Sequence, residues 1–462
     1  MQLHKKSIFG PWPFYRGALG IAVPIMLQQL IQSLVSLIDN FMVSGLGDIC
    51  MSGVNVAGQM LFIFMVYLNT VCMAGGIFMT QFYGAEDRSG MRQAFRFKLI
   101  TGLAAFIPYL LVCVAFPRQA LSLLLIGNTQ ADLILDEAVR YIRIMAFIGV
   151  PMTLSVCIAT SLRDMGKVKT PLLITVIATL TNTLFNWLLI YGNLGFPRLG
   201  VEGAALATVI ARALELALFI ALYARERPDF AVKPAALLQI DGALFRDILK
   251  KGALVLFCEM VWVLSETVTT ALYNGRGGAD VVSGMSAGWA IVNLLFVSFG
   301  GINTATSVII GKTLGKGQLD EARNQSRWML SAAVVFGLFM ALMGALVTLL
   351  TPLVFGHLSS VAQGICRDLV LLVSLYMPLW VYSNVQFSIA RAGGDTVMGA
   401  VVDGCVTLAV VIPGILLLAR FTDWGPVLMY GVLKLTDFIK IIVAHLWLKK
   451  EKWVKNLTVQ AA

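Results

Sequence analysis

The sequence predicts an all-α membrane protein whose twelve transmembrane helices form two six-helix lobes related by an internal repeat. Apolar side chains make up 58% of the 462 residues and charged ones 13%, whereas a soluble domain has roughly 45–50% apolar and about 25% charged residues. The mean hydropathy is +0.83. Apolar blocks recur along the whole chain, and short polar landmarks repeat at an offset of about half its length. Together these three observations exclude a protein built from soluble domains.

Twelve apolar blocks approach or exceed the roughly 20 residues that a membrane-spanning helix needs. The second and eighth are long enough to tilt or to extend beyond the bilayer. No stretch alternates with the period of two residues that a transmembrane β-barrel requires. The blocks are 17–43, 52–81, 97–116, 139–161, 171–191, 201–223, 252–274, 281–311, 328–350, 368–390, 396–419 and 425–448.

The basic residues predict how the helices are oriented. If the N-terminus lies inside and the helices alternate, the inside segments hold 25 of the 35 Lys and Arg residues and the outside loops hold seven. Such an excess is typical of cytoplasmic segments. We therefore expect a multi-pass plasma (inner) membrane protein with both termini cytoplasmic. The net charge of +10 then reports topology, and no nucleic-acid partner is expected.

The two halves of the chain resemble each other. Tyr83-Gly84 corresponds to Leu314-Gly315 at an offset of 231 residues, and Arg163-x-x-Gly166 corresponds to Arg391-x-x-Gly394 at 228. Both halves start inside, so the repeat is parallel, about an axis normal to the membrane. We expect an N-terminal lobe over 1–223, a cytoplasmic linker with an amphipathic helix over 224–251, and a C-terminal lobe over 252–462. Two further landmark pairs are Gly45-Leu46-Gly47 with Gly275-Arg276-Gly277 and Ser52-Gly53 with Ser283-Gly284.

Enzymatic chemistry has little support in the sequence. The seven cysteines are scattered and never form a CxxC, so neither a disulfide framework nor a zinc site is indicated. Only three histidines are present, and no Walker or dinucleotide-binding motif occurs. We expect no catalytic residue, no cofactor and no assignable metal site. The partners expected are the lipid bilayer and a small-molecule substrate, and the chain is expected to act as a monomer.

Ionisable groups inside apolar helices are costly and mark candidate functional sites. Asp39 is the first, and Gln28, Gln32 and Ser36 precede it on nearly the same stripe of one helix. We expect that polar face to line a cavity. A buried carboxylate of this kind can take up a proton or hold Na⁺; the alternative is a carboxylate neutralised by a structural hydrogen bond.

Two asparagines form a second polar face in the same half. Asn182 and Asn186 lie one helical turn apart, and Thr208 on the following block adds a hydroxyl. Their oxygens are hard ligands suited to Na⁺ or to a hydrogen bond with a carboxylate. Ordinary interhelical polar contacts are the competing interpretation.

The sharpest site of the C-terminal half combines Glu259, Trp262 and Glu266. The two acids lie two turns apart on one stripe with the tryptophan between them. An acid there can titrate or neutralise a cationic substrate, and the indole offers a cation–π surface; a structural role for the acids is the alternative.

The other charges inside the apolar blocks suggest local neutralisation. Arg212 is spaced to pair with Glu215, and Asp437 is three residues from both Lys434 and Lys440. Asp403 has no partner nearby in the sequence.

Seven segments, spread in order over essentially the whole chain, have the pattern of one transporter family. They are the Asp39 helix ending in Gly45-Leu46-Gly47, Gln81-Phe82-Tyr83-Gly84-Ala85, Leu162-Arg163-Asp164-Met165-Gly166 running to Thr170-Pro171, Asn182 to Asn186 continuing into Leu189-Ile190-Tyr191-Gly192, Gly200 to Thr208, Glu259-Met260-Val261-Trp262, and Arg391-Ala392-Gly393-Gly394-Asp395-Thr396. Together they resemble the MATE (multidrug and toxic compound extrusion) transporters, particularly their DinF-like bacterial branch.

The resemblance implies two six-helix lobes around a central cavity and export of organic cations or amphipathic drugs in exchange for H⁺ or Na⁺. In this comparison Asp39 matches the coupling carboxylate, Asn182 its partner amide, and Glu259 the glutamate of the C-terminal lobe. Asn186 stands where the archaeal pattern has a second acid. That departure leaves coupling to Asp39 alone or shifts it toward Glu259. Another branch of the family is expected to have a carboxylate on the tenth transmembrane helix. No such acid is evident in this chain near Asn384.

Three other functions compete with the antiporter. A lipid-linked precursor flippase of related two-lobe architecture would favour a basic cavity for its pyrophosphate, whereas the membrane interior here has three bases against six acids. A membrane enzyme is disfavoured by the few histidines and the missing cofactor motifs. A channel fits two repeated lobes with lone buried acids less well than a carrier does.

Overall fold

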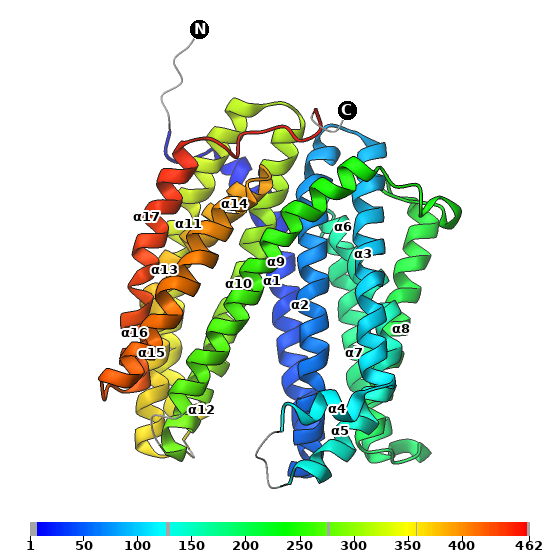
Figure 1. Ribbon diagram of the computed structural model, residues 1–462, viewed down its shortest axis with the longest axis vertical. Helices are drawn as coiled ribbons and strands as arrows, with labels where there is room; N and C mark the ends of the chain where they lie inside the picture. Colours follow the sequence, from blue (N-terminus) through cyan, green and yellow to red (C-terminus); the bar gives the residue numbers. More distant parts are fainter. Residues whose placement is uncertain (1–6, 126–129, 275–277, 357, 460–462) are drawn as a thin grey trace. The chain divides into compact units, whose positions relative to one another are not determined.

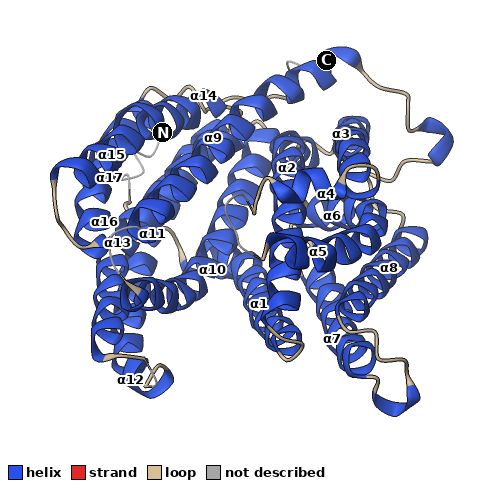
Figure 2. Cartoon of the chain, turned by 60° about the horizontal axis from the view of Figure 1, so that its bottom comes forward, coloured by secondary structure: helices blue, strands red, loops and turns tan. Residues whose placement is uncertain are grey.

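The computed structural model describes residues 7–125, 130–274, 278–356 and 358–459. Within these ranges the chain folds into helices joined by short loops, with no strand (Figures 1 and 2). Landmark Gly275-Arg276-Gly277 lies outside the described residues. The all-α prediction is confirmed.

The helices match the predicted apolar blocks and extend a few residues further into polar sequence. The fourth block is divided between two helices, the eleventh is interrupted by π-helical segments over Ala400–Cys405 and Thr407–Val411, and the twelfth is split beside Leu435. The helices are α1 Trp12–Ser44, α2 Asp48–Gly84, α3 Arg88–Val114, α4 Pro117–Ser122, α5 Ala131–Met145, α6 Gly149–Asp164, α7 Lys169–Tyr191, α8 Val201–Glu226, α9 Gly242–Asn274, α10 Ala279–Gly315, α11 Leu319–Val347, α12 Thr351–Val354, α13 Ser360–Ala392, α14 Thr396–Gly399, α15 Ile412–Phe421, α16 Pro426–Lys434 and α17 Thr436–Lys449.

The helix boundaries reproduce the internal repeat. Helices α1 and α9 both have 33 residues, and α2 and α10 both have 37. The helices that precede Gly166 and Gly394 end alike: each glycine is left-handed, with φ of 79° and 76°, and each donates its N–H to an arginine carbonyl over 2.8 Å. Glycine is favoured at a left-handed position after a helix because glycine has no Cβ.

Ten helical spans among the described residues are long and apolar enough to cross a membrane. The two remaining predicted spans are α9, which begins with charged residues, and the pair α16 and α17, which are divided at Leu435. All twelve predicted blocks are therefore helical over most of their length.

The described chain divides into two compact units. One contains the residues up to Met26, 80–86 and the chain from Leu249; the other contains Leu27–Met79 and Asp87–Ile248. In the first, α13 packs along both α10 and α11. In the second, α7 packs along α8, and α3 packs against α6. The predicted lobes at 1–223 and 252–462 differ from these units at α1 and α2, and they stay a prediction.

The linker differs in detail from the predicted amphipathic helix. Helical structure resumes at Gly242, where the Asp241 carboxylate accepts the N–H groups of Ala243 and Leu244 over 2.9 and 3.2 Å. Such a side chain satisfies N–H groups that the first helical turn leaves free. The helix then continues as α9, so the segment before it holds only a 3₁₀ turn at Pro234–Ala236.

Candidate functional site

Asp39 lies at the centre of a hydrogen-bonded group within the second unit. Asn186 on α7 donates its amide to Asp39 Oδ1 over 2.8 Å. In the orientation that gives both ends of the Asn182 amide a partner, its nitrogen donates to Asp39 Oδ2 over 2.7 Å. Because the two asparagines are one turn apart on α7, they reach the two oxygens of one carboxylate.

Helices α8 and α5 complete the surroundings of this carboxylate. The Asn182 oxygen accepts from the Thr208 hydroxyl over 3.3 Å. Tyr141 on α5, which the sequence did not indicate, lies near both Thr208 and Asp39. No basic side chain among the described residues forms an ion pair with Asp39. The group is thus a carboxylate held by neutral dipoles in a helical bundle.

One atom of this group lacks a partner. The Oδ1 oxygen of Asn186 is buried and accepts no hydrogen bond. A buried polar atom without a partner costs free energy, and a cation or a proton donor beside Asp39 would satisfy it. Asp39, Asn182, Asn186 and Thr208, all predicted to act together, are the residues that the structure brings together.

The rest of the predicted polar stripe on α1 does not join Asp39. Gln28 is buried, but it donates to Thr175 over 2.7 Å and accepts from Arg163 over 3.1 Å. Ser36 is exposed and Gln32 is half-buried, and neither hydrogen-bonds a described residue. Gln28 and Asp39 share one stripe of α1 but lie in two different polar environments.

Gln28 belongs to a second polar network in the same unit. Thr175 on α7 also contacts Glu215 on α8 over 3.5 Å, and Arg212 pairs with Glu215 over 2.7 Å. The pairing of Arg212 with Glu215 was predicted from their spacing. The network ties α1, α6, α7 and α8 together and neutralises the buried Glu215.

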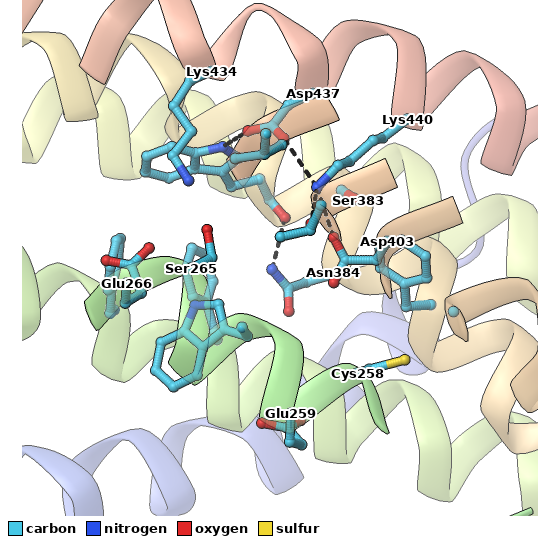
Figure 3. A pocket seen from close by; sticks show the side chains of 18 of the residues that line it. Cys258, Glu259, Ser265, Glu266, Ser383, Asn384, Asp403, Lys434, Asp437 and Lys440 are labelled. Atoms are coloured by element: carbon cyan, nitrogen blue, oxygen red, sulfur yellow. Dashed lines mark hydrogen bonds and ion pairs between the residues drawn. The ribbon is translucent and has the colours of Figure 1, made fainter. Parts of the chain in front are cut away.

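The first unit contains a cavity of about 810 Å³ between α9, α10, α13, α14 with the π-helical segments that follow it, α16 and α17 (Figure 3). Its wall mixes charged, hydroxyl, amide and aromatic side chains. Those that bear on its chemistry are Glu259, Trp262, Ser265, Glu266, Trp289, Phe296, Trp380, Asn384, Arg391, Asp403, Thr407, Tyr430, Lys434, Asp437 and Lys440.

The three residues predicted for the C-terminal half all line this cavity. Glu259 and Glu266 on α9 are half-buried, and neither forms a hydrogen bond or an ion pair with a described residue. Arg391 on α13 acts electrostatically on Glu259. Trp262 is 50% exposed, so its ring is available to a ligand.

The sequence did not predict the ion pair on the opposite wall. Lys440 on α17 is buried and donates to Asp403 over 2.8 Å and to Thr407 over 3.0 Å, and Asp437 lies 3.8 Å from it. Asp403 and Thr407 belong to the π-helical segments, which are frequent at functional sites. Asp403 therefore has a partner from α17, and Lys434 is left out of the local neutralisation that the spacing predicted.

The MatE family model matches residues 24–188 and 255–416, one block in each half of the chain. A probable multidrug resistance protein NorM from Geobacillus kaustophilus is 27% identical over 326 residues, which cover 68% of each chain. Its counterpart from Thermotoga maritima is 23% identical over 316 residues, covering 67% of this chain and 66% of that protein. The probable multidrug resistance protein YoeA of Bacillus subtilis is 25% identical over 418 residues, covering 87% and 86%.

Solved structures of similar fold extend over nearly the whole chain. A MATE structure in the bent conformation matches with a TM-score of 0.84 at 17% identity and covers 97% of both chains. A MOP superfamily transporter from Pyrococcus furiosus, described as having a binding pocket of reverse polarity, matches with a TM-score of 0.83 at 18% identity and covers 98% of both. The resemblance drawn from the motifs is confirmed, and the chain belongs to the MatE family.

Proposed function

We propose that this chain is a secondary antiporter that exports organic cations or amphipathic drugs in exchange for H⁺ or Na⁺. The observation that carries the proposal is the Asp39 carboxylate, held by two amides and by no basic partner among the described residues. A carboxylate in such surroundings binds a cation or a proton readily. The relatives' names, which refer to multidrug resistance, support the same function.

The ion that couples transport would bind at Asp39, Asn182, Asn186 and Thr208. The free Asn186 oxygen supplies a ligand next to the carboxylate. Sodium would use that oxygen together with Asp39, whereas a proton would convert Asp39 into a donor toward it. Binding of either Na⁺ or a proton would give the Asp39 site a second state with a different charge. Antiport requires two such states.

The substrate would occupy the cavity bordered by Glu259, Trp262 and Glu266. Uncompensated carboxylates attract organic cations, and an exposed indole binds their apolar or cationic faces. Ion and substrate would favour different states of a two-lobed carrier, with lobes over 1–223 and 252–462 that move about the linker. The protein would act as a monomer in the inner membrane with both termini cytoplasmic.

Efflux of a fluorescent organic cation from everted membrane vesicles tests this function. Wild type should transport under an imposed pH or Na⁺ gradient, and Asp39→Asn should lose the gradient dependence. Asp132→Asn is the matched control, since that side chain is 90% exposed and Arg118 is its one ion-pair partner within the described part of the chain. Unchanged gradient dependence in Asp39→Asn would show that coupling lies elsewhere.

A lipid-linked precursor flippase remains the second candidate. Arg391, Lys434 and Lys440 line the cavity and give a pyrophosphate three basic side chains. Lys440, however, is engaged by Asp403 and Asp437, and Glu259 and Glu266 border the same cavity. The acids favour the antiporter. Translocation of a labelled polyprenyl pyrophosphate in proteoliposomes without a gradient would favour the flippase instead.

A further inference from the structure

The last described residues, 451–459, pack against the ends of other helices of the first unit. We call them the C-terminal segment; it follows α17 and is drawn in red in Figure 1. Its Trp453 and Leu457 side chains are buried. At its start, Glu451 pairs with Arg323 on α11 over 3.0 Å. The segment is therefore part of the folded unit.

A single buried side chain at the end of α2 connects this segment to two helices. The Gln81 amide nitrogen donates to the Lys455 carbonyl over 3.3 Å, and the Gln81 oxygen accepts from the Leu457 N–H over 2.7 Å. The same nitrogen donates to the Ala392 carbonyl at the end of α13 over 2.8 Å. Gln81 thus uses both ends of its amide on backbone groups that no element of regular structure pairs.

The second half of the chain leaves room for this segment. A Cβ at Gly393 would overlap the Trp453 carbonyl. At the offset of 228 residues that relates Arg391 to Arg163, the first half has Met165, whose side chain is buried. The position that a methionine side chain fills in one half is therefore left open for the C-terminal segment in the other.

Helix α2 extends the effect of this anchor to the second unit. Residues 48–79 of α2 group with the second unit, and residues 80–86 group with the first. Because α2 is one continuous helix, a segment that holds its end at Gln81 also restrains the rest of the helix. The segment holds α10 as well, since Asn456 donates to the Gly315 carbonyl over 3.3 Å. It therefore connects a helix from each half of the chain.

The ends of these two helices are in close contact. A Cβ at Gly311 on α10 would overlap the Thr80 side chain on α2. In a carrier with alternating access, the two halves must part on one side of the membrane while they close on the other. The ends of α2 and α10 belong to different halves and are closed here.

We propose that the C-terminal segment is a latch that holds the ends of α2 and α10 together. It must release Gln81 before the carrier opens on that side, which is the cytoplasmic side in the proposed orientation. The role of the latch in transport rests on the proposed function, whereas the latch itself rests on contacts within the first unit.

The reactivity of a cysteine between α2 and α10 tests the latch. Thr80→Cys is placed in the full chain with its native cysteines replaced by alanine. Because Thr80 is 2% exposed, the new thiol should react with a maleimide only when the helix ends part. Labelling is followed on the purified protein in detergent. Gln81→Leu should raise the rate about fivefold, as a loss of about 1 kcal/mol of hydrogen bonding would give. Gln59→Leu, the same change at an exposed position of α2, is the matched control and should have no effect.

A second variant displaces the segment without changing α2. Gly393→Ala places a Cβ against the Trp453 carbonyl, so it should also speed labelling at position 80. A parallel set of proteins keeps only Cys366, which is fully buried on α13. That thiol reports unfolding and should stay unlabelled in every variant.

Transport of a fluorescent organic cation by everted vesicles connects the latch to the carrier. Release of the latch should increase the fraction of carrier that is open to the cytoplasm. The apparent affinity for a substrate follows the fraction of protein that can bind it. We therefore expect the apparent affinity to rise by a factor similar to that of the labelling rate.

Three results would overturn the proposal. Labelling at the wild-type rate in either Gln81→Leu or Gly393→Ala would show that the segment does not hold the helix ends. Labelling of Cys366 in parallel with position 80 would assign the effect to unfolding. Faster labelling with an unchanged apparent affinity would remove the latch from the transport cycle. Labelling requires neither gradient nor substrate, so faster labelling of a chain that transports nothing would support the latch and refute only the antiporter.

Discussion

Gly84 at the end of α2 and Gly315 at the end of α10 each lie against the backbone of the other's helix. A Cβ at Gly84 would overlap the carbonyl of Lys312, and one at Gly315 would overlap the carbonyl of Gln81. The two glycines occupy equivalent positions of the repeat, at an offset of 231 residues. The crossing of these helix ends therefore depends on two small residues that the repeat supplies once in each half.

Replacing either glycine by alanine should force the crossing apart. We expect Gly84→Ala and Gly315→Ala each to destabilise the protein by about 1–3 kcal/mol, as overpacking does elsewhere. Thermal unfolding of the purified protein measures the effect. Gly58→Ala, on the same helix as Gly84, is the control: nothing lies within 4 Å of its added Cβ, so it should be neutral or slightly stabilising. Equal melting temperatures for all three variants would contradict the assignment.

A second acid beside Asp39 should change the number of protons exchanged. Asn186 already donates to Asp39 over 2.8 Å, so Asn186→Asp places two carboxylates at hydrogen-bond distance. Two such groups share a proton because both cannot be ionised cheaply. We expect the variant to keep this shared proton up to a more alkaline pH than wild type does, so that it releases more protons on binding substrate at alkaline pH. A pH indicator in weakly buffered solution measures the count. Thr183→Asp, three residues earlier on α7, controls for an added charge. An unchanged count would separate Asn186 from the coupling site.

The sequence predicted where the helices lie and some of the polar groups that meet, such as Arg212 with Glu215, but not the contacts between residues far apart in the chain. Helix positions follow from apolar blocks of sufficient length and from the repeat, both of which are local or periodic properties. The bonds of Gln28 to Thr175 and Arg163 join residues 147 and 135 positions apart. The shared stripe on α1 gives no sign that Gln28 and Asp39 have different partners. The contact of Lys440 with Asp403 depends on π-helical segments, for which the sequence carries no recognised signal.

The C-terminal segment after α17 should loosen when its anchor is removed. Gln81 is fully buried; its amide nitrogen donates to the Ala392 carbonyl over 2.8 Å, and its oxygen accepts from the Leu457 N–H over 2.7 Å. Leucine at this position keeps the volume but leaves those backbone groups unpaired, which costs about 1–3 kcal/mol for each buried group. We expect Gln81→Leu to speed tryptic cleavage after Lys452 and Lys455 several-fold.

The control for that experiment is Gln119→Leu, since Gln119 is exposed on α4. Cleavage is followed by mass spectrometry of the released peptides under conditions that leave the helices intact. If both variants are cut at the wild-type rate, Gln81 does not hold the segment, and packing of the buried Trp453 and Leu457 suffices.

The ion pair between Lys440 and Asp403 should stabilise the packing of α17 against the π-helical segments. Neither side chain should have this effect without the other. Lys440→Met leaves Asp403 and Asp437 without their shared cation. Breaking a fully buried pair costs about 3–5 kcal/mol. Because Asp403 remains 38% exposed and solvent screens it, we expect Lys440→Met to lower the free energy of unfolding by about 2 kcal/mol.

The double variant Lys440→Met with Asp403→Asn should recover at least half of that loss, since it removes the uncompensated charge as well. Denaturant unfolding of the four proteins gives the coupling energy as a double-mutant cycle. Additive losses would mean that the two side chains stabilise the fold independently, through packing and through Thr407 or Trp380, which hydrogen-bond Lys440 and Asp437 respectively.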